Sequence, residues 1–134
     1  MRTTKFIEES IPKVAKLIHA TNDPKWLTIR FAIFISLSIN EPIEKKKLNF
    51  KDGKVYSLEV ITGKGKSEGD YTDIIALMIA NNDNIELKNE KELEKYLELH
   101  AQRGFEILTS SLNQNSNIFE WIKEEFLNTP NSNS

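Results

Sequence analysis

The segment KWLTIRFAIFISLSI, residues 25–39, has the most influence on the fold, because it is the most apolar part of the chain and is compatible with two structures. Apolar residues at 27, 29, 31, 33, 35, 37 and 39 alternate with smaller or polar ones, and only Phe34 interrupts this strand pattern. The run is, however, about twice the usual strand length of roughly 5–6 residues. Asp23 and Pro24 ahead of it also form a helix-start signal. A helix here would be apolar almost all round and buried on several sides, which favours an oligomer.

The residues before this segment predict a strand over 3–8, a helix over 11–20 with Ser10 as its N-cap, and a break at 21–24. In the restart after the break, we expect Asp23 to cap the next helix and Pro24 to occupy its first turn. With a helix over 25–39, this is the order of a ribbon-helix-helix unit, in which N-terminal strands pair across a dimer and face DNA. Neither face of the 3–8 strand is cleanly polar, so the pattern also fits an ordinary strand.

The residues after the segment predict a second strand and a set of helices. Glu41-Pro42 ends the central helix, a basic loop spans 43–53, and alternation predicts a strand over 55–61. The further helices are predicted from their start signals: one over 71–80 after Asp70 with Asp73, a long one after Asn89 with Glu92, and a last one after Asn117 with Glu120. The predicted fold is therefore mainly α with two short strands: an N-terminal strand-helix-helix followed by a small helical bundle.

Composition limits both the size of the protein and its chemistry. The 134 residues, 39% of them hydrophobic, suit one domain, which we place at 1–128, with a disordered polar tail over 129–134. The absence of Cys excludes disulfides, thiolate zinc sites and cysteine nucleophiles. No apolar run approaches the roughly 20 residues that span a bilayer, and the N-terminus shows no secretory signal. We therefore expect a cytoplasmic protein without a membrane segment.

Charge is divided unevenly along the chain. Residues 1–66 carry 13 Lys or Arg against 7 Asp or Glu, whereas residues 67–134 carry 5 against 13. A basic face of this kind attracts phosphate, although solvated loop lysines would give the same composition. By this electrostatic argument, the predicted DNA-binding residues are Lys5, Lys13, Lys16, Lys45, Lys46, Lys47, Lys51, Lys54, Lys64 and Lys66.

The residue types that carry chemistry have simpler explanations here. Glu68, Asp70, Asp73 and His100 are the only arguable metal-binding set, and helix capping already accounts for the two aspartates. His100 and Gly104 share an apolar helical stripe, so we expect a hydrogen-bonded core histidine and a close helix contact. The 63–67 loop lacks the glycine spacing of a phosphate loop, and no Ser-His-Asp constellation is visible. We therefore predict no catalytic residue, cofactor or metal.

Three separated stretches, SLSINEP at 36–42, GDY at 69–71 and LELHAQRG at 97–104, resemble the DndE family of bacterial DNA phosphorothioation proteins. The resemblance covers about residues 5–112 and implies a helix over the ambiguous segment, which is our prediction. It also implies a small DNA-binding subunit that engages duplex or nicked DNA as a homo-oligomer, with a tetramer as the first expectation. The partners that it implies are a cysteine desulfurase, a sulfurtransferase resembling an ATP-pyrophosphatase and a coiled-coil ATPase, which perform the chemistry.

We therefore expect a non-catalytic, DNA-contacting subunit of a phosphorothioation complex. Two alternatives belong to other classes. A ribbon-helix-helix transcriptional regulator would bind a palindromic sequence with preference, and a small nickase would cut DNA in the presence of Mg²⁺ or Mn²⁺. The resemblance does not identify individual lysines.

Overall fold

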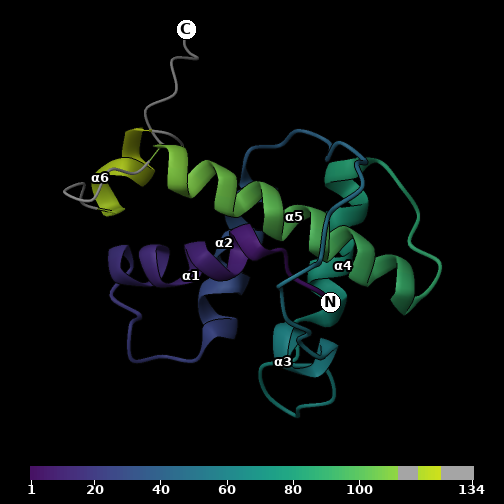
Figure 1. The fold of residues 1–134 in the computed structure, drawn as a ribbon. Helices are drawn as coiled ribbons and strands as arrows, with labels where there is room; N and C mark the ends of the chain where they lie inside the picture. Colours follow the sequence, from purple (N-terminus) through teal and green to yellow (C-terminus); the bar gives the residue numbers. More distant parts are fainter. Residues whose placement is uncertain (112–117, 125–134) are drawn as a thin grey trace, which may run out of the picture.

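The computed structural model describes residues 1–111 and 118–124 of the chain. The helices in these ranges are α1 (Lys5–Leu17), α2 (Lys25–Ser38), α3 (Leu58–Thr62), α4 (Thr72–Asp83), α5 (Glu90–Ser111) and α6 (Ile118–Ile122). The long helix α5 crosses the molecule, with α1 and α2 near its C-terminal half and α3 and α4 on the side of its N-terminal half (Figure 1). The predicted start signal at Asn117 and the predicted tail over 129–134 lie outside the described residues.

The ambiguous segment forms α2, so the prediction of a helix is confirmed. Ile29, Ala32 and Ile33 are fully buried, and α2 packs mainly against α5 while also contacting α1, α3 and α4. Because neighbours within the same chain cover several sides of α2, this helix needs no broad polar face. The expected cap is not formed, however: Pro24 occupies the N-cap position, and Asp23 makes no capping hydrogen bond to α2.

The predicted strand over 3–8 is wrong, because α1 begins at Lys5. Thr4 rather than Ser10 is the N-cap, and its hydroxyl accepts a hydrogen bond from the Ile7 N–H at 3.1 Å. Ile7 also extends the apolar spacing of the helix upstream: it is buried in the core together with Ile11 and Val14. The Thr, Phe and Ile residues of this segment favour a strand locally. The helical spacing of the buried residues Ile7, Ile11 and Val14 favours a helix more strongly.

The predicted strand over 55–61 is also wrong. Ser57 caps the short helix α3 by accepting a hydrogen bond from the Val60 N–H, and the helix ends at Gly63, whose φ of 78° is left-handed. Extended pairing in the described ranges is limited to one antiparallel bridge between Arg2 and Val55. Since residues 1–3 pair with residues 54–56 of the same chain, they do not form the ribbon strand of a ribbon-helix-helix dimer. That fold prediction is therefore corrected to an all-helical one.

The start signals of the later helices are largely confirmed. Asn89 caps α5 by accepting the Glu92 N–H at 2.9 Å, and Glu92 accepts a backbone N–H in return, from Lys88 at 2.8 Å. Asp70 lies one residue outside the cap position of α4, where its carboxylate accepts the Thr72 N–H at 3.0 Å. Asp73 is in the first turn of α4, where a carboxylate is favourable to the helix dipole.

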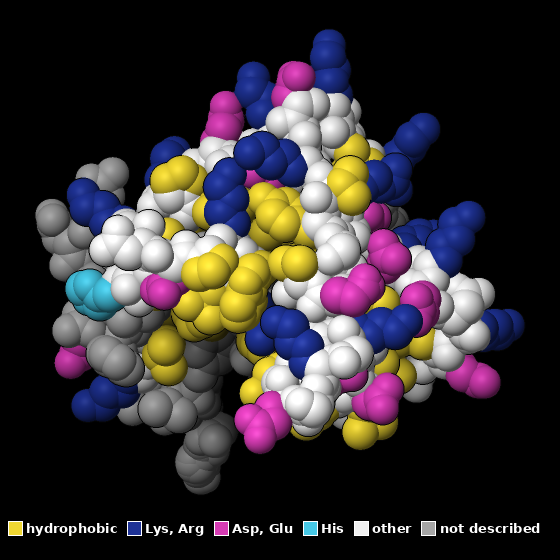
Figure 2. Space-filling view, turned by 90° about the horizontal axis from the view of Figure 1, so that it is seen from below, with side chains coloured by type: hydrophobic (Ala, Val, Ile, Leu, Met, Phe, Trp, Pro, Cys, Tyr) yellow, Lys and Arg dark blue, Asp and Glu magenta, His cyan; other side chains and the backbone are white. Residues whose placement is uncertain are grey.

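A patch of hydrophobic side chains gathers near the middle of the face seen in Figure 2, while Lys and Arg side chains lie around the patch and toward the edges of the view. The larger apolar residues that remain exposed lie mostly on α2, α3 and α4, and include Leu27, Val60, Tyr71, Ile74 and Leu77. Across residues 1–111 and 118–124, no helix is both long enough and apolar enough to cross a membrane.

Candidate functional site

Four polar side chains meet inside the protein where α2, α4 and α5 converge: Ser36, Asp83, His100 and Arg103, the polar cluster. Ser36 and His100 are fully buried, and the Asp83 residue is 9% exposed. His100 Nδ1 lies 2.8 Å from Ser36 Oγ, and His100 Nε2 lies 2.7 Å from Asp83 Oδ2. Arg103 Nε donates to Ser36 Oγ at 2.7 Å. These contacts connect residues far apart in the sequence into one continuous network.

The donors and acceptors of the polar cluster are all matched when His100 is neutral. In the neutral tautomer that carries its proton on Nε2, Ser36 Oγ accepts from Arg103 Nε and donates its own proton to His100 Nδ1. The proton on Nε2 then goes to Asp83 Oδ2. Burial lowers the pKa of His100 below its ordinary value, and it outweighs the opposing effect of Asp83. A neutral imidazole therefore satisfies every partner in this buried network.

Arg103 and Asp83 also anchor the chain where α2 ends. The Arg103 guanidinium donates to the carbonyl oxygens of Ser36, Glu41 and Pro42 at 2.8, 2.9 and 3.1 Å. Carbonyls at the end of a helix have no intrahelical partner, and a planar guanidinium suits several of them at once. Asp83 Oδ1 accepts the Ile43 N–H at 2.6 Å. The polar cluster thus fixes the start of residues 43–55, which we call the basic segment.

The contacts in the polar cluster indicate a structural role. Sequence patterns did not reveal a Ser-His-Asp set, because Ser36 and His100 are 64 positions apart and Asp83 lies in a predicted loop. A nucleophilic serine must reach a substrate, whereas Ser36 is fully buried and held by two partners. The prediction that His100 is a hydrogen-bonded core residue is confirmed. So is the close contact at Gly104, where a Cβ atom would overlap the carbonyl oxygen of Ala32 in α2.

The metal-binding set weighed from the sequence is not brought together. Glu68, Asp70 and Asp73 are exposed, whereas His100 is buried with both ring nitrogens hydrogen-bonded. The Asp70 carboxylate accepts backbone N–H groups of Gly65 and Thr72, each at 3.0 Å, and hydrogen bonding to Thr72 lowers the pKa of Asp70. In residues 1–111 and 118–124, no three His, Asp or Glu side chains are arranged to hold a metal ion.

The ten predicted DNA-binding lysines lie in three places. Lys5, Lys13 and Lys16 are exposed on α1, while Lys64 and Lys66 lie between α3 and α4, where Lys64 is half-buried and forms an ion pair with Glu90. The other five, Lys45, Lys46, Lys47, Lys51 and Lys54, are all exposed along the basic segment. Of these five, Lys46 has an ion pair with a described residue, Glu106 at 3.6 Å. The basic segment is therefore the largest group of exposed cations that the described structure holds in one stretch of chain.

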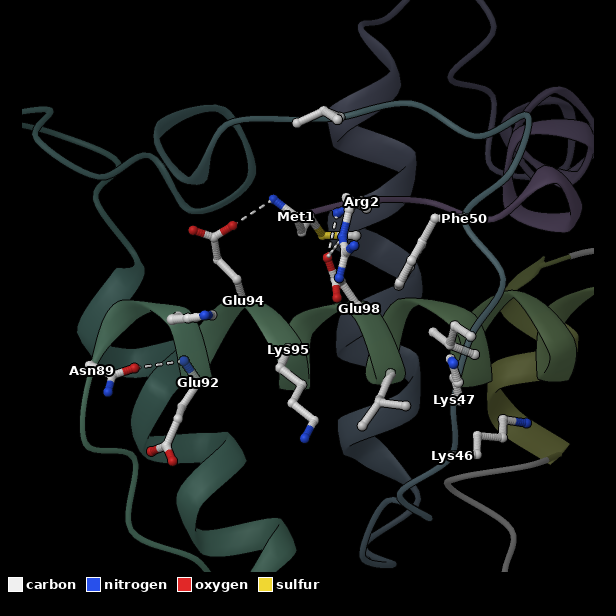
Figure 3. Close-up of a pocket in the computed structure, with 14 residues that line it drawn as sticks. Met1, Arg2, Lys46, Lys47, Phe50, Asn89, Glu92, Glu94, Lys95 and Glu98 are labelled. Carbon is white, nitrogen blue, oxygen red and sulfur yellow. Dashed lines mark hydrogen bonds and ion pairs between the residues drawn. The ribbon is translucent and has the colours of Figure 1, made fainter.

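A groove of about 870 Å³ lies between the basic segment and α5 (Figure 3). Lys46 and Lys47 line it from the basic segment, and Arg2, Lys91 and Lys95 line it from residues outside the predicted set. Arg2 stacks on the Phe50 ring, with 4.0 Å from its guanidinium carbon to the ring centroid. Lys91 and Lys95 were missed because they belong to the acidic half of the sequence. Their spacing of four positions, one helical turn, was the sequence signal that could have placed them together on one face of α5.

A model of the family described as DNA sulphur modification protein DndE matches residues 1–116 of the 134-residue chain. The matched region includes the polar cluster, the basic segment and the whole of α5. Comparisons with curated proteins and with solved structures found no match. The family resemblance predicted from the three short stretches is thus confirmed over most of the chain: the protein belongs to the DndE family, and its role lies in DNA sulphur modification.

Proposed function

We propose that this protein is a non-catalytic subunit that contacts DNA during sulphur modification. The observation that carries the proposal is the basic segment, in which five lysines between positions 45 and 54 are exposed. Exposed lysines bind the phosphate backbone through counterion release, without a motif and with little sequence preference. Lys5, Lys13, Lys16, Lys64 and Lys66 extend the same electrostatic attraction over other parts of the surface. The sulphur chemistry then falls to partner proteins, for which a sulfurtransferase and an ATPase are our candidates.

The polar cluster and the α4 cap support the non-catalytic part of the proposal. His100, the strongest single candidate for acid–base chemistry, is buried and neutral, with both ring nitrogens engaged. Asp70 binds backbone N–H groups instead of projecting freely. We expect the purified protein to leave supercoiled plasmid intact with Mg²⁺ or Mn²⁺. Metal-dependent nicking that disappears in a folded Asp73→Asn variant would instead assign a nickase activity.

The DNA-binding part is tested by replacing Lys45, Lys46 and Lys47 together with Gln. Binding to a DNA duplex should weaken, and the slope of log K against log salt should flatten by up to about 0.9 for each phosphate that the variant no longer neutralises. The matched control replaces Lys88 and Lys123 with Gln, since both are exposed lysines of the acidic half. An unchanged affinity and slope in the triple variant would show that these lysines do not contact DNA.

We also propose that the protein works as a homo-oligomer. Tyr71, Ile74 and Leu77 expose 46, 54 and 68% of their surface at successive turns of one helical face, and α2 adds Leu27 at 37%. Exposed apolar surface of this kind is typical of protein interfaces. In a symmetric assembly, a second copy of the chain would cover this apolar surface, and we expect a tetramer first.

Sedimentation at micromolar concentration tests the assembly, and the expected species is heavier than the 15.4 kDa monomer. A variant with Ile74→Glu and Leu77→Glu should dissociate, because charged side chains are depleted from the centre of interfaces. Val55→Glu is the control: Val55 is 78% exposed and pairs with Arg2 in the bridge, outside α4. A wild-type protein that sediments as a folded monomer would contradict self-association.

A further inference from the structure

The groove between α5 and the basic segment carries more positive than negative side chains, although α5 belongs to the acidic half of the chain. Five cationic side chains line it, together with the carboxylates of Glu92, Glu94 and Glu98. Glu94 accepts a hydrogen bond from the amino group of Met1 at 3.0 Å, and Glu98 accepts from the Arg2 backbone N–H at 2.7 Å. The five cationic side chains outnumber the three carboxylates, and Glu94 and Glu98 are already ion-paired with the Met1 amino group and Arg2, which leaves an excess of positive charge in the groove.

Three of the groove's cations, Lys47, Lys91 and Lys95, are exposed and form no ion pair with another residue of 1–111 or 118–124. Lys95 projects from α5, and Lys47 is carried by the basic segment beside the helix (Figure 3). Lys91 lies one helical turn before Lys95. An anionic ligand that follows α5 would thus meet positive charge from both walls.

Part of the groove lining is apolar, which matters for the class of ligand. Leu48, Val55 and Leu99 line it, and the Val55 residue is 78% exposed. The Phe50 ring is the only aromatic surface among the described lining residues, and the Arg2 guanidinium already covers one of its faces. A single-stranded nucleic acid relies on open aromatic faces for stacking, whereas aliphatic lining residues suit the apolar side chains of a peptide.

The backbone beside the groove can also pair with a peptide. Arg2 and Val55 form an antiparallel bridge, flanked by hydrogen bonds between Thr3 and Lys54 and between Met1 and Tyr56. In this pattern the N–H and C=O of Val55 point away from the bridge partner. An extended segment could add to that edge by main-chain hydrogen bonds, a recognition mode that nucleic acid cannot use.

We propose that this groove binds an extended acidic segment of a partner protein, with aliphatic side chains on Leu48 and Val55 and carboxylates on Lys91 and Lys95. A polypeptide suits the mixed charge of the groove better than a phosphate backbone, because it can place aliphatic side chains beside Glu92, Glu94 and Glu98 and its carboxylates beside Lys91 and Lys95. This site is distinct from the proposed DNA contact. Lys46 and Lys47 border both, so the charge test uses Lys91 and Lys95, which lie on α5 outside the basic segment.

The test measures fluorescence anisotropy of a labelled peptide, Glu-Glu-Leu-Glu-Val-Glu-Glu, against the full-length protein. A peptide with Gln in place of every Glu is the matched probe. The Lys91→Gln, Lys95→Gln variant should bind the acidic peptide about fivefold to tenfold more weakly, the sum expected for two exposed ion pairs. A second variant, Val55→Asp, should also weaken binding of the acidic peptide, because the new carboxylate repels the peptide and the apolar side chain is lost. The control variant carries Lys88→Gln and Lys123→Gln and should bind the acidic peptide as the wild type does.

A DNA duplex is measured in parallel, and its affinity for the Lys91→Gln, Lys95→Gln variant should stay within about twofold of wild type. Three results would overturn the proposal: equal binding of the Glu and Gln peptides, peptide binding unaffected by the groove substitutions, or no binding of the acidic peptide. A parallel loss of duplex affinity in the groove variant would assign the groove to nucleic acid instead. Circular dichroism of each variant establishes that it is folded.

Discussion

The polar cluster and the basic segment are joined through Asp83 and Ile43, yet they use charge in opposite ways. In the polar cluster, every charged or polar side chain is buried or half-buried and hydrogen-bonded within the protein. In the basic segment, the lysines are exposed, and among the described residues only Lys46 forms an ion pair. Burial makes each polar group depend on its partner, whereas exposed charge remains available to a ligand.

This contrast separates the three short stretches that resemble the family from the residues that we expect to bind DNA. Ser36, His100, Arg103 and Gly104 belong to the family-like stretches, and the structure uses them to join α2, α4 and α5. The lysines of the basic segment belong to no such stretch. A short motif can therefore identify a family through its core while leaving the contact surface unspecified.

The largest effect is expected at the crossing of α2 and α5. Gly104→Ala places a Cβ atom against the Ala32 carbonyl, so the two helices must separate, and we expect a loss of about 3 kcal/mol in the free energy of unfolding. At an exposed helical site, Gly→Ala would instead stabilise by about 1 kcal/mol. Urea unfolding followed by circular dichroism measures the difference, with Ser110→Ala on the exposed surface of α5 as the control. A stabilised Gly104→Ala protein would show that the helices do not approach this closely.

Arg103→Lys should be next in size. Lysine has no planar fork, so it cannot donate to Ser36 and to the carbonyls of Glu41 and Pro42 at the same time, and some of these acceptors lose their donor. We expect a destabilisation of about 2 kcal/mol in urea unfolding. The matched control is Arg2→Lys, where the side chain is 57% exposed and the expected loss is below about 1 kcal/mol. Equal losses in the two variants would remove the distinction between the buried cluster and the surface.

The pH dependence of stability tests the neutral state of His100. Its pKa is lowered by burial, so between that pKa and about 6.5 the unfolded chain binds more protons than the folded one. Stability should therefore fall as the pH drops below about 6.5, by at most about 1.4 kcal/mol per pH unit from this residue. His100→Gln should flatten that slope. A slope that survives in His100→Gln would place its origin elsewhere.

The smallest effect on folding is expected in the basic segment. Replacing Lys45, Lys46 and Lys47 with Gln should change the free energy of unfolding by less than about 0.5 kcal/mol, because these side chains are exposed. The same variant should bind DNA more weakly. Thermal unfolding and DNA titration of one preparation measure both quantities. A large loss of stability would show that these lysines hold the fold as well.

Local patterns predicted part of the candidate site. The Asn89 and Glu92 signal located the start of α5, and the charge division located the basic segment. The partners of His100 and the contribution of Lys91 and Lys95 to the groove were not predictable in this way. They depend on which surfaces of α2, α4 and α5 face one another, which side-chain spacing within one helix does not define.

Short-range sequence signals were sufficient for the family, the start of α5 and the basic character of residues 43–53, because these depend on residues close together in the chain. Tertiary packing determined whether the segments at 3–8 and 55–61 are strands or helices. A strand requires a partner strand to satisfy its backbone, and only one bridge, between Arg2 and Val55, forms among the described residues. Helices satisfy their own backbone, so capping by Thr4 and Ser57 and burial of Ile7, Leu58 and Ile61 favoured the helix in both segments.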